Sequence, residues 1–501
     1  MVKKKFKNLG VYFDQLADDN PSKILLKFSS REEFSFKYLN ELSDKFFLYF
    51  DSINLRENDL IAIESKKNIY SFAIIIAALK KGVAYSFVNF SESEKRANLI
   101  LKKLKPKKTF LFDKKKTFLK STLISEKLIK KIKKIKIKKK INLKNKSFVA
   151  YVMFTSGSTG EPKGVKISHF NLIFFINWVK KTFKINKNSI MTNLNPLHFD
   201  NSVFDIYGSI FNNATLVPVE KSEILNCKKL FFKLKKTRCN LWFSVPSLLN
   251  LILKIEKPKI FKNTGIKKII FGGEKFPIES VRSIFKYLKN SHIFNVSGPT
   301  ECTCMCSAHL VNKKELFEKD NISVGKINNY FNYKIVKTGI KRNPSKRGEL
   351  YLEGPAVSRG YINDKKRTSE KFYKAGKYYG YKTGDIVVEG KNKNLNIIGR
   401  EDNQIKFLGH RIEIEEIENN INNIFRLREC LVIFTRKTTF PYEKLILLTD
   451  KKSINNEHII QKLSKHLPKY MIPEDVRYVN SFKLNQNGKV DRKYYSKFFK
   501  I

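Results

Sequence analysis

Cysteine and long apolar runs are both scarce in this sequence. Its 501 residues include only six cysteines, which are too few and too clustered for a disulfide framework in a chain of this length. The best apolar stretch, Tyr70–Leu79, is about half of the roughly 20 residues needed to span a bilayer. No apolar segment follows the charged start, Met1–Gly10, so a secretory signal is not expected. The sequence predicts a soluble, cytoplasmic protein without a membrane span.

Acidic residues and arginine are also under-represented. Against 99 Lys and Arg stand 46 Asp and Glu, a formal net charge of +53, and only about 16 of the basic residues are arginine. Such a field would attract nucleic acid or acidic partners, but bases and phosphates are usually recognised by arginine forks. Lysine excess alongside abundant Asn, Ile and Phe favours drift in an A+T-rich genome, so nucleic acid is not expected as a partner. The densest run, Lys102–Lys146, is interpreted as a lysine-rich edge strand or solvated loop, with a nucleic-acid arm as the alternative.

The chain contains enough apolar residues to form packed cores, and its predicted strands and helices alternate. The apolar fraction is 42% and 22 Gly and 14 Pro are spread along the chain, which excludes collagen-like and disordered classes. A single core stops growing near about 250 to 300 residues, so at least two domains are expected. Strands and helices are predicted to alternate at Ile24–Phe28, Phe34–Phe50, Leu60–Glu64, Tyr70–Lys81 and Ala84–Val88. This alternation predicts an α/β fold of parallel βαβ units.

The composition changes near Arg400. Beyond it, strand-like Leu431–Phe434 and Leu445–Leu448 are followed by helical Glu457–Leu467. We therefore expect a large N-terminal α/β domain over residues 1–400 and a small α+β C-terminal domain over residues 401–501.

A loop of small and hydroxylated residues, TSGSTGEPKG, follows the apolar strand Tyr151–Phe154. Backbone N–H groups and hydroxyls converging at the end of a strand favour a phosphate-binding loop. It is not the GxxxxGK[ST] P-loop, because Gly164 rather than Ser or Thr follows its lysine. The loop residues predicted to contact phosphate are Thr155, Ser156, Gly157, Ser158, Thr159, Gly160 and Lys163.

From this loop outward the sequence resembles the adenylate-forming superfamily, and within it the amino-acid adenylation enzymes: D-alanine ligases that charge a carrier protein and adenylation domains of nonribosomal peptide synthetases. Ten blocks carry the resemblance in order along nearly the whole chain. They are Phe34–Leu42, Leu79–Val88, Thr155–Gly164, Phe199–Ser202 (FDNS), Gly272–Glu274 (GGE), Gly298–Thr303 (GPTECT), Gly348–Leu352, Tyr381–Asp385 (YKTGD), Gly399–Glu413 and Asn487–Arg492 (NGKVDR).

The resemblance implies ATP and Mg²⁺ as cofactors. Glu301 stands at the family's magnesium carboxylate, and Thr300 would bind the α-phosphate. Asp385 and Arg400 stand at positions that contact the ribose, with a surface ion pair as the alternative reading. The remaining nucleotide-binding residues it implies are Gly272, Gly273, Glu274, Ser297, Gly298 and Pro299.

The resemblance also implies two charged residues for an amino-acid substrate. Asp200 matches the aspartate that pairs with the substrate ammonium, although an Asp capping a helix over Ser202–Ile210 is the alternative. Lys489 matches the catalytic lysine, which would bridge the two anions in the transition state. Aligned pocket positions are Asn201, Phe204, Ile270, Gly272, Val296, Cys304 and Met305. None of these seven is charged, which favours a small or medium neutral amino acid such as alanine.

Two departures from the family pattern stand out. Ser297 replaces the aromatic residue that normally stacks on adenine, a contact worth about 1 to 3 kcal/mol per base. Cys302, Cys304 and Cys306 alternate, which on a strand would space the sulfurs about 7 Å apart on one face, unsuited to tetrahedral zinc. We interpret these cysteines as small buried residues.

The expected function is ATP-dependent formation of an aminoacyl-AMP, then transfer to a phosphopantetheine thiol. The chain ends ten residues after Asp491, so the thiol is expected on a separate, acidic carrier protein. Asp402 stands at the family's hinge, about which the C-terminal domain would rotate. The alternatives are an acyl- or aryl-CoA synthetase of the same fold, and a catalytically weak basic binding protein.

Overall fold

The structure is a computed structural model that divides into two compact units. It describes residues 6–113, 121–137, 141–157, 161–318, 322–336, 347–427, 429–436, 443–451, 454–484 and 490–498. Unit 1 comprises Met1–Val88, Leu104–Phe154 and Gly164–Glu401. Unit 2 comprises Asn89–Lys103, Thr155–Lys163 and Asp402–Ile501. Two short segments of the N-terminal part therefore group with the C-terminal residues. The predicted sites Ser158, Thr159, Gly160 and Lys489 lie outside the described residues.

Unit 1 is built on three sheets. The order of the nine-stranded sheet is β15 (Lys326–Ile327), β14 (Ser307–Val311), β13 (His292–Ser297), β12 (Lys268–Gly272), β11 (Leu241–Ser244), β9 (Ile190–Asn193), β10 (Thr215–Pro218), β1 (Ile24–Lys27) and β2 (Glu33–Ser35). The order of the six-stranded sheet is β6 (Ser121–Leu123), β5 (Lys108–Leu111), β3 (Leu60–Glu64), β4 (Ala84–Val88), β7 (Val149–Thr155) and β8 (Lys163–Ser168). The third sheet contains β16 (Asn332–Val336), β17 (Arg347–Gly354), β18 (Phe372–Ala375), β19 (Tyr378–Glu389) and β20 (Leu395–Arg400).

The central strands of the first two sheets pair in parallel, as the alternating sequence predicts. β11 pairs in parallel with β12, and β12 in parallel with β13. All four residues of β11 are buried, since a parallel strand is covered on both faces and therefore reads as a continuous apolar run. The carboxyl ends of these strands are where ligands bind in open α/β sheets. The candidate residues at Gly272 and Ser297 lie at two such ends.

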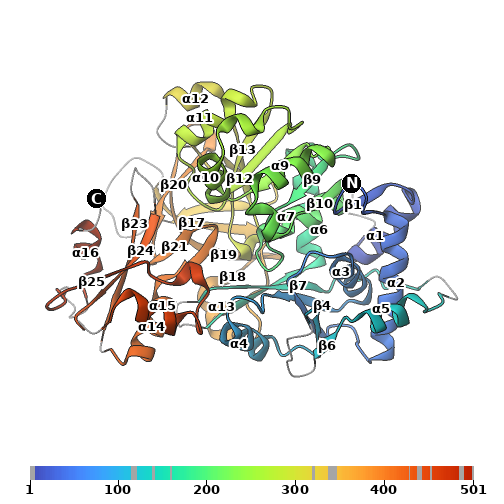
Figure 1. The fold of residues 1–501 in the computed structure, drawn as a ribbon, viewed down its shortest axis with the longest axis horizontal. Helices are drawn as coiled ribbons and strands as arrows, with labels where there is room; N and C mark the ends of the chain where they lie inside the picture. The colour runs from blue at the N-terminus through green and yellow to red at the C-terminus, as the bar shows by residue number, and fades with distance from the viewer. Residues whose placement is uncertain are drawn as a thin grey trace. The chain divides into compact units, whose positions relative to one another are not determined.

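Helices α1 (Leu9–Asp19), α2 (Phe36–Ser52) and α3 (Ile69–Lys81) pack together at the N-terminal end of unit 1 (Figure 1). The Asn68 side chain accepts from the Ser71 amide and begins α3, and Gly82 ends it with a φ of 72°. The amine of Lys80 is fully buried and pairs with Asp14 of α1 and Asp44 of α2. One cation therefore joins all three helices.

The remaining α-helices of unit 1 are α5 (Glu126–Lys133), α6 (His169–Thr182), α7 (Asn201–Ile210), α8 (Lys221–Ile224), α9 (Cys227–Lys236), α10 (Pro246–Ile255), α11 (Ile278–Tyr287), α12 (Lys313–Glu318) and α13 (Lys365–Lys371). Each follows a strand, except α9, which follows α8. The reading of the lysine-rich run as an edge strand or loop is correct in part. β6 lies at the edge of its sheet and residues 134–137 and 141–146 have no helix or strand, but residues 130–133 end the helix α5. Its apolar side chains, including buried Ile132, face the core while its lysines face solvent.

Unit 2 contains α4 (Glu94–Leu104), whose last residue belongs to unit 1, a hairpin of β21 (Gln404–Phe407) and β22 (His410–Glu413), and a three-stranded sheet. The sheet consists of β23 (Leu431–Arg436), β24 (Glu443–Thr449) and β25 (Asp475–Tyr478), which lie side by side in Figure 1. Helices α14 (Ile414–Phe425), α15 (Asn456–Leu463) and α16 (Arg492–Phe498) complete it. α15 is shorter than predicted, because Ser464 caps it and a turn follows.

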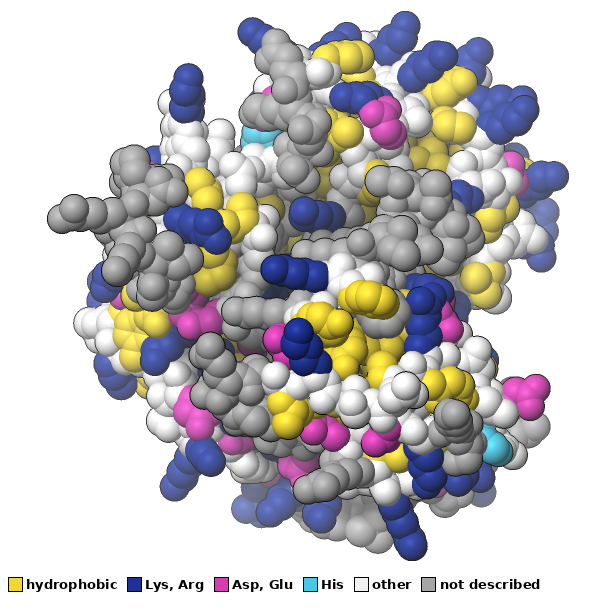
Figure 2. Space-filling model, turned by 90° about the vertical axis from the view of Figure 1, so that its left-hand side faces the viewer, with side chains coloured by type: hydrophobic (Ala, Val, Ile, Leu, Met, Phe, Trp, Pro, Cys, Tyr) yellow, Lys and Arg dark blue, Asp and Glu magenta, His cyan; other side chains and the backbone are white. Residues whose placement is uncertain are grey.

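On the face shown in Figure 2, Lys and Arg side chains are scattered with Asp and Glu between them rather than gathered in one stripe. Among the residues that the structure describes, no helix is long and apolar enough to cross a membrane.

Candidate functional site

Asp200 and Thr300 meet in unit 1. Asp200 immediately precedes α7, and its Oδ2 accepts a hydrogen bond of 2.5 Å from the Thr300 hydroxyl. The Asp200 side chain makes no capping hydrogen bond to the helix, so the alternative reading of this residue as a helix cap is wrong. Two residues one hundred positions apart in sequence are thus brought together.

Glu301 follows Thr300 on a three-residue 3₁₀ turn, η2 (Thr300–Cys302). Its side chain is fully buried, and its Oε1 accepts a hydrogen bond of 2.8 Å from the hydroxyl of Tyr361. The backbone amide of Ser358 donates to the Glu301 carbonyl, also at 2.8 Å. Burial of a carboxylate is costly unless polar groups or a cation stabilise it, and the Tyr361 hydroxyl supplies part of that stabilisation.

Close backbone approach explains two glycines of the site. A Cβ at Gly272 would lie 2.2 Å from the Val296 carbonyl oxygen, and a Cβ at Gly298 would lie 2.4 Å from Cα of Met305. The predicted pocket residue Phe204 is buried and packs edge-on against Phe183 and Phe243, with ring centroids 5.4 and 4.7 Å away. A side chain in place of Gly272 or Gly298 would therefore push the strand end and the following loop apart.

The three alternating cysteines are buried, but they do not lie on a strand. Cys302 ends the 3₁₀ turn, and Thr303 and Cys304 adopt positive φ angles of 60° and 75°. β14 begins only at Ser307, so the premise of a single strand face is corrected. Burial, followed by the nearby Asp200 carboxylate, raises the pKa of the Cys304 thiol well above its usual value. Within the described part of the chain, no group of three or more His, Cys, Asp or Glu could hold a metal ion.

Asp385 and Arg400 form an ion pair across β19 and β20. Nη1 of Arg400 lies 2.6 Å from Oδ1 of Asp385, and its Nη2 donates to the Thr383 carbonyl at 3.2 Å. Both charged side chains are largely buried, at 10% and 13% exposure. The two residues therefore form an ion pair, as in the alternative reading, but the pair is largely buried rather than on the surface.

A buried polar network surrounds Asp205 of α7. Oδ2 of Asp205 accepts from the side-chain amides of Asn193 and Asn195 at 2.8 and 3.0 Å. The amine of Lys67 donates to the carbonyls of Asn193, Leu194 and Val219. Burial raises the pKa of Asp205 to about 7 and lowers the pKa of Lys67 to about 8. Sequence reasoning missed this network, although Asp205 lies only five residues beyond Asp200.

In unit 2 the predicted phosphate-binding loop contacts two carboxylates. The Ser156 hydroxyl donates to the Arg411 carbonyl at 2.6 Å, and the Gly157 amide donates to Oε2 of Glu416 at 3.2 Å. Nζ of Lys163 pairs with Oε1 of Glu413 at 3.0 Å. Donors that the sequence assigned to phosphates are thus engaged with carboxylates. Glu413 lies in a block that was recognised in the sequence, yet nothing in that block indicated this contact.

Glu416 has a further partner in α4. Its Oε1 accepts from Nη1 of Arg96. Burial raises the pKa of Glu416, and the Arg96 guanidinium opposes that shift. Asp402, the predicted hinge, accepts from the Gln404 amide through Oδ1 at 3.3 Å. Ion pairs between segments 250 and 320 residues apart in sequence therefore join the parts of unit 2.

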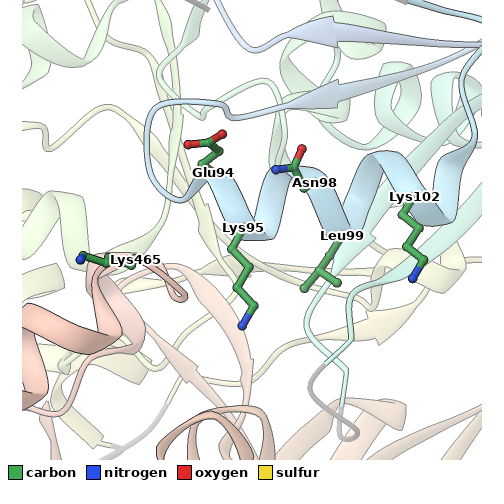
Figure 3. A pocket seen from close by; sticks show the side chains of 6 residues that line it. All are labelled: Glu94, Lys95, Asn98, Leu99, Lys102 and Lys465. Carbon is green, nitrogen blue, oxygen red and sulfur yellow. The ribbon is translucent and has the colours of Figure 1, made fainter. Parts of the chain in front are cut away.

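A basic pocket of about 400 Å³ also lies within unit 2 (Figure 3). Lys95, Leu99 and Lys102 point to one side of α4, while Glu94 and Asn98 point to the other, and Lys465 comes from the segment after α15. Nζ of Lys95 lies 2.8 Å from Nδ1 of His466. Burial and the two neighbouring lysines, Lys95 and Lys465, lower the pKa of His466. An anion would be favoured beside these cations.

Comparison with known proteins identifies relatives of this chain. The family model described as AMP-binding enzyme matches residues 13–362. A D-alanine–D-alanyl carrier protein ligase of Listeria monocytogenes serotype 4b (strain F2365) is 33% identical over 358 residues, 68% of this chain and 69% of the relative. The ligase of the same name from Lacticaseibacillus rhamnosus is 30% identical over 351 residues, with the same shares.

Solved structures are similar over nearly the whole chain. A nonribosomal peptide synthetase protein containing adenylation and PCP domains has a TM-score of 0.84 and 19% identity, with 99% of this chain and 85% of that chain covered. The Vibrio cholerae adenylation domain AlmE, in complex with glycyl-adenosine-5'-phosphate, has a TM-score of 0.79 and 19% identity, with 97% of each chain covered. At this identity the similarity concerns the fold, and it confirms the predicted α/β class with a large N-terminal and a smaller C-terminal part. By its family match and its identity to these ligases, the chain belongs to the family of AMP-binding enzymes.

Proposed function

We propose that this protein activates a small neutral amino acid with ATP and transfers it to a carrier protein. The substrate carboxylate attacks the α-phosphorus of ATP, the bond to the β-phosphate breaks, and pyrophosphate leaves. The phosphopantetheine thiol of a separate carrier then attacks the acyl carbon, a thioester forms, AMP leaves and the thiol proton passes to solvent. Relatives at 33% identity named D-alanine–D-alanyl carrier protein ligase support this class of substrate and partner.

Asp200 and Lys489 would hold the two ends of the amino acid. A part-buried carboxylate at Asp200 suits an ammonium group, since a charge that is partly removed from water is stabilised by a partner of opposite sign. The hydroxyl of Thr300 now occupies Asp200 Oδ2, and it would turn to the α-phosphate when the ammonium arrives. Lys489 would stabilise the charge that builds up between the attacking carboxylate and the phosphate.

The residues around Glu301 fit a magnesium ion. The carboxylate is fully buried beside a hydroxyl-bearing turn, and Mg²⁺ prefers oxygen ligands and the phosphates of its substrate. Bound there, the ion would neutralise phosphate charge. Asp385 would accept hydrogen bonds from the ribose hydroxyls, and Arg400 would hold that carboxylate in place through the ion pair of 2.6 Å.

We further propose that residues 401–501 act as a mobile lid that turns about Asp402. In the first half-reaction Lys489 would lie at the reacting carboxylate, and after rotation the segment 403–411 would replace it for attack by the thiol. A closed lid would exclude water from the hydrolysis-prone mixed anhydride.

The hydrogen bond between Thr300 and Asp200 is the observation on which this proposal depends, because it joins the ammonium ligand to the phosphate ligand. The test is amino-acid-dependent ATP–pyrophosphate exchange across the twenty amino acids and D-alanine. We expect one small neutral amino acid to give the highest rate. In the same assay Lys489→Ala should abolish exchange but keep thioester formation from preformed adenylate. Absence of exchange with every amino acid would overturn the proposal.

A further inference from the structure

Tyr361 connects the candidate metal carboxylate to the strand that follows the glycine-rich loop. Its hydroxyl donates to Oε1 of Glu301 at 2.8 Å. Its backbone forms an antiparallel bridge with Val165 of β8. Its ring is 3% exposed and packs edge-on against Phe372, with centroids 5.2 Å apart. Glu301 therefore holds the hydroxyl of Tyr361, and packing against Phe372 holds its ring.

The segment around Tyr361 is attached to β8 at several points. The amide of Ile362 donates to the Gly164 carbonyl at 2.7 Å, and the amide of Lys166 donates to the Gly360 carbonyl at 3.2 Å. The Ser358 hydroxyl donates to the Lys166 carbonyl at 2.8 Å. Gly164 is needed for this approach, because a Cβ there would lie 2.7 Å from Cγ2 of Ile362. Segment 358–362 thus lies antiparallel beside β8 and is attached to it by these hydrogen bonds.

The same segment holds Glu301 twice. Ser358 binds its backbone carbonyl, and Tyr361 binds its carboxylate. The Ser358 contact fixes the backbone of the turn at Glu301, and the Tyr361 contact fixes one oxygen of the Glu301 carboxylate. A hydrogen bond to an ionised acceptor is stronger and more directional than one between neutral groups. The phenol therefore orients the carboxylate plane.

We propose that Tyr361 is a positioning residue for the metal-binding carboxylate Glu301. This inference rests on the proposed function, in which Glu301 binds Mg²⁺. Tyr361 would act through the Glu301 carboxylate, to which its hydroxyl donates. Partners that orient a metal ligand in this way typically change metal affinity by about 10- to 100-fold. It also ties the orientation of that carboxylate to the strand that leaves the glycine-rich loop.

The test compares Tyr361→Phe with a matched variant, Tyr373→Phe. Each substitution removes one phenolic hydroxyl that donates to a glutamate, since Tyr373 donates to Glu353 at 3.0 Å. Mn²⁺ affinity of the protein with a non-hydrolysable ATP analogue is measured by electron paramagnetic resonance. We expect about tenfold weaker Mn²⁺ binding in Tyr361→Phe and wild-type binding in Tyr373→Phe. The Mg²⁺ concentration for half-maximal pyrophosphate exchange should rise by the same factor, with little change in rate at saturating Mg²⁺.

A double-mutant cycle separates loss of the hydrogen bond between Tyr361 and Glu301 from general damage to the fold. In a Glu301→Gln background, Tyr361→Phe should have no further effect on Mn²⁺ affinity. Wild-type Mn²⁺ affinity in Tyr361→Phe, or an equal further loss in the Glu301→Gln background, would overturn the inference. Absence of pyrophosphate exchange in the wild-type protein would instead overturn the proposed function, and the Mn²⁺ measurements would still decide the role of Tyr361.

Discussion

Nζ of Lys163 lies 3.0 Å from Oε1 of Glu413, and both side chains are less than a tenth exposed. ATP phosphates would need the same ammonium group, so the carboxylate and the nucleotide compete for it. Glu413→Gln should therefore strengthen ATP binding by about three- to tenfold, since the competing pair is buried and charged. Isothermal titration calorimetry with ATP measures this change. Glu415→Gln, whose side chain is exposed and bonds to Asn403, is the control. Weaker ATP binding in Glu413→Gln would contradict the competition.

Asp200→Ala should lower amino-acid-dependent pyrophosphate exchange by at least about 100-fold, because the substrate ammonium would lose its counter-charge in a buried site. A carboxylic acid of the same size without an amine should be activated equally by the variant and the wild type. Exchange rates with the amino acid and with its desamino analogue separate these effects. If both substrates lost rate equally, Asp200 would not be the ammonium ligand, and the acyl-CoA synthetase alternative would gain support.

Asp205→Asn should change how stability depends on pH. Burial of the carboxyl raises the folded-state pKa of Asp205 to about 7, from the ordinary aspartate value of 3.8. The folded state therefore holds the proton more tightly than the unfolded state between those pH values, so this group favours folding at low pH and its contribution is lost as pH rises to about 7. Subtracting the variant's unfolding free energy from that of the wild type, at pH 5 and pH 7.5, should give a smaller difference at pH 7.5. A constant difference would show that Asp205 does not titrate in this range.

Asp402→Pro tests the hinge. Proline fixes φ near −65°, so rotation about residue 402 should be restricted. We expect thioester formation on the carrier to fall by about tenfold or more while pyrophosphate exchange stays within about twofold of the wild type. Radiolabelled amino acid transferred to carrier measures the first, and Asp450→Pro, at a bend in the same unit, controls for general damage. Undiminished transfer would place the hinge elsewhere.

The bounds of two parallel strands in the six-stranded sheet could be predicted from the sequence. β3 (Leu60–Glu64) and β4 (Ala84–Val88) have the bounds that their apolar runs predicted, since a buried parallel strand bounded by polar residues is a strong local signal. Ordered motifs likewise located Asp200, Thr300 and Glu301, and the structure brings the first two into hydrogen-bonding contact.

Other features depend on contacts that local sequence does not encode. Tyr361 reaches Glu301 from 60 residues away, and nothing in its neighbourhood marks it as different from the other tyrosines. The cysteines at 302, 304 and 306 are buried, as the sequence predicts, but positive φ angles at Thr303 and Cys304 turn the chain, so they do not share the face of a strand. Such angles are set by the surrounding packing rather than by residue preference.

Lys80 offers a way to follow the unfolding of the N-terminal helices. Its side chain has no exposed area and lies between two carboxylates from different helices, whereas most lysines of this chain face solvent. An amine-reactive label should modify exposed lysines within the first moments and reach Lys80 only when α1, α2 and α3 separate. The rate at which the peptide containing Lys80 becomes labelled therefore reports how fast that part of the molecule opens. Mass spectrometry measures this rate without an engineered probe.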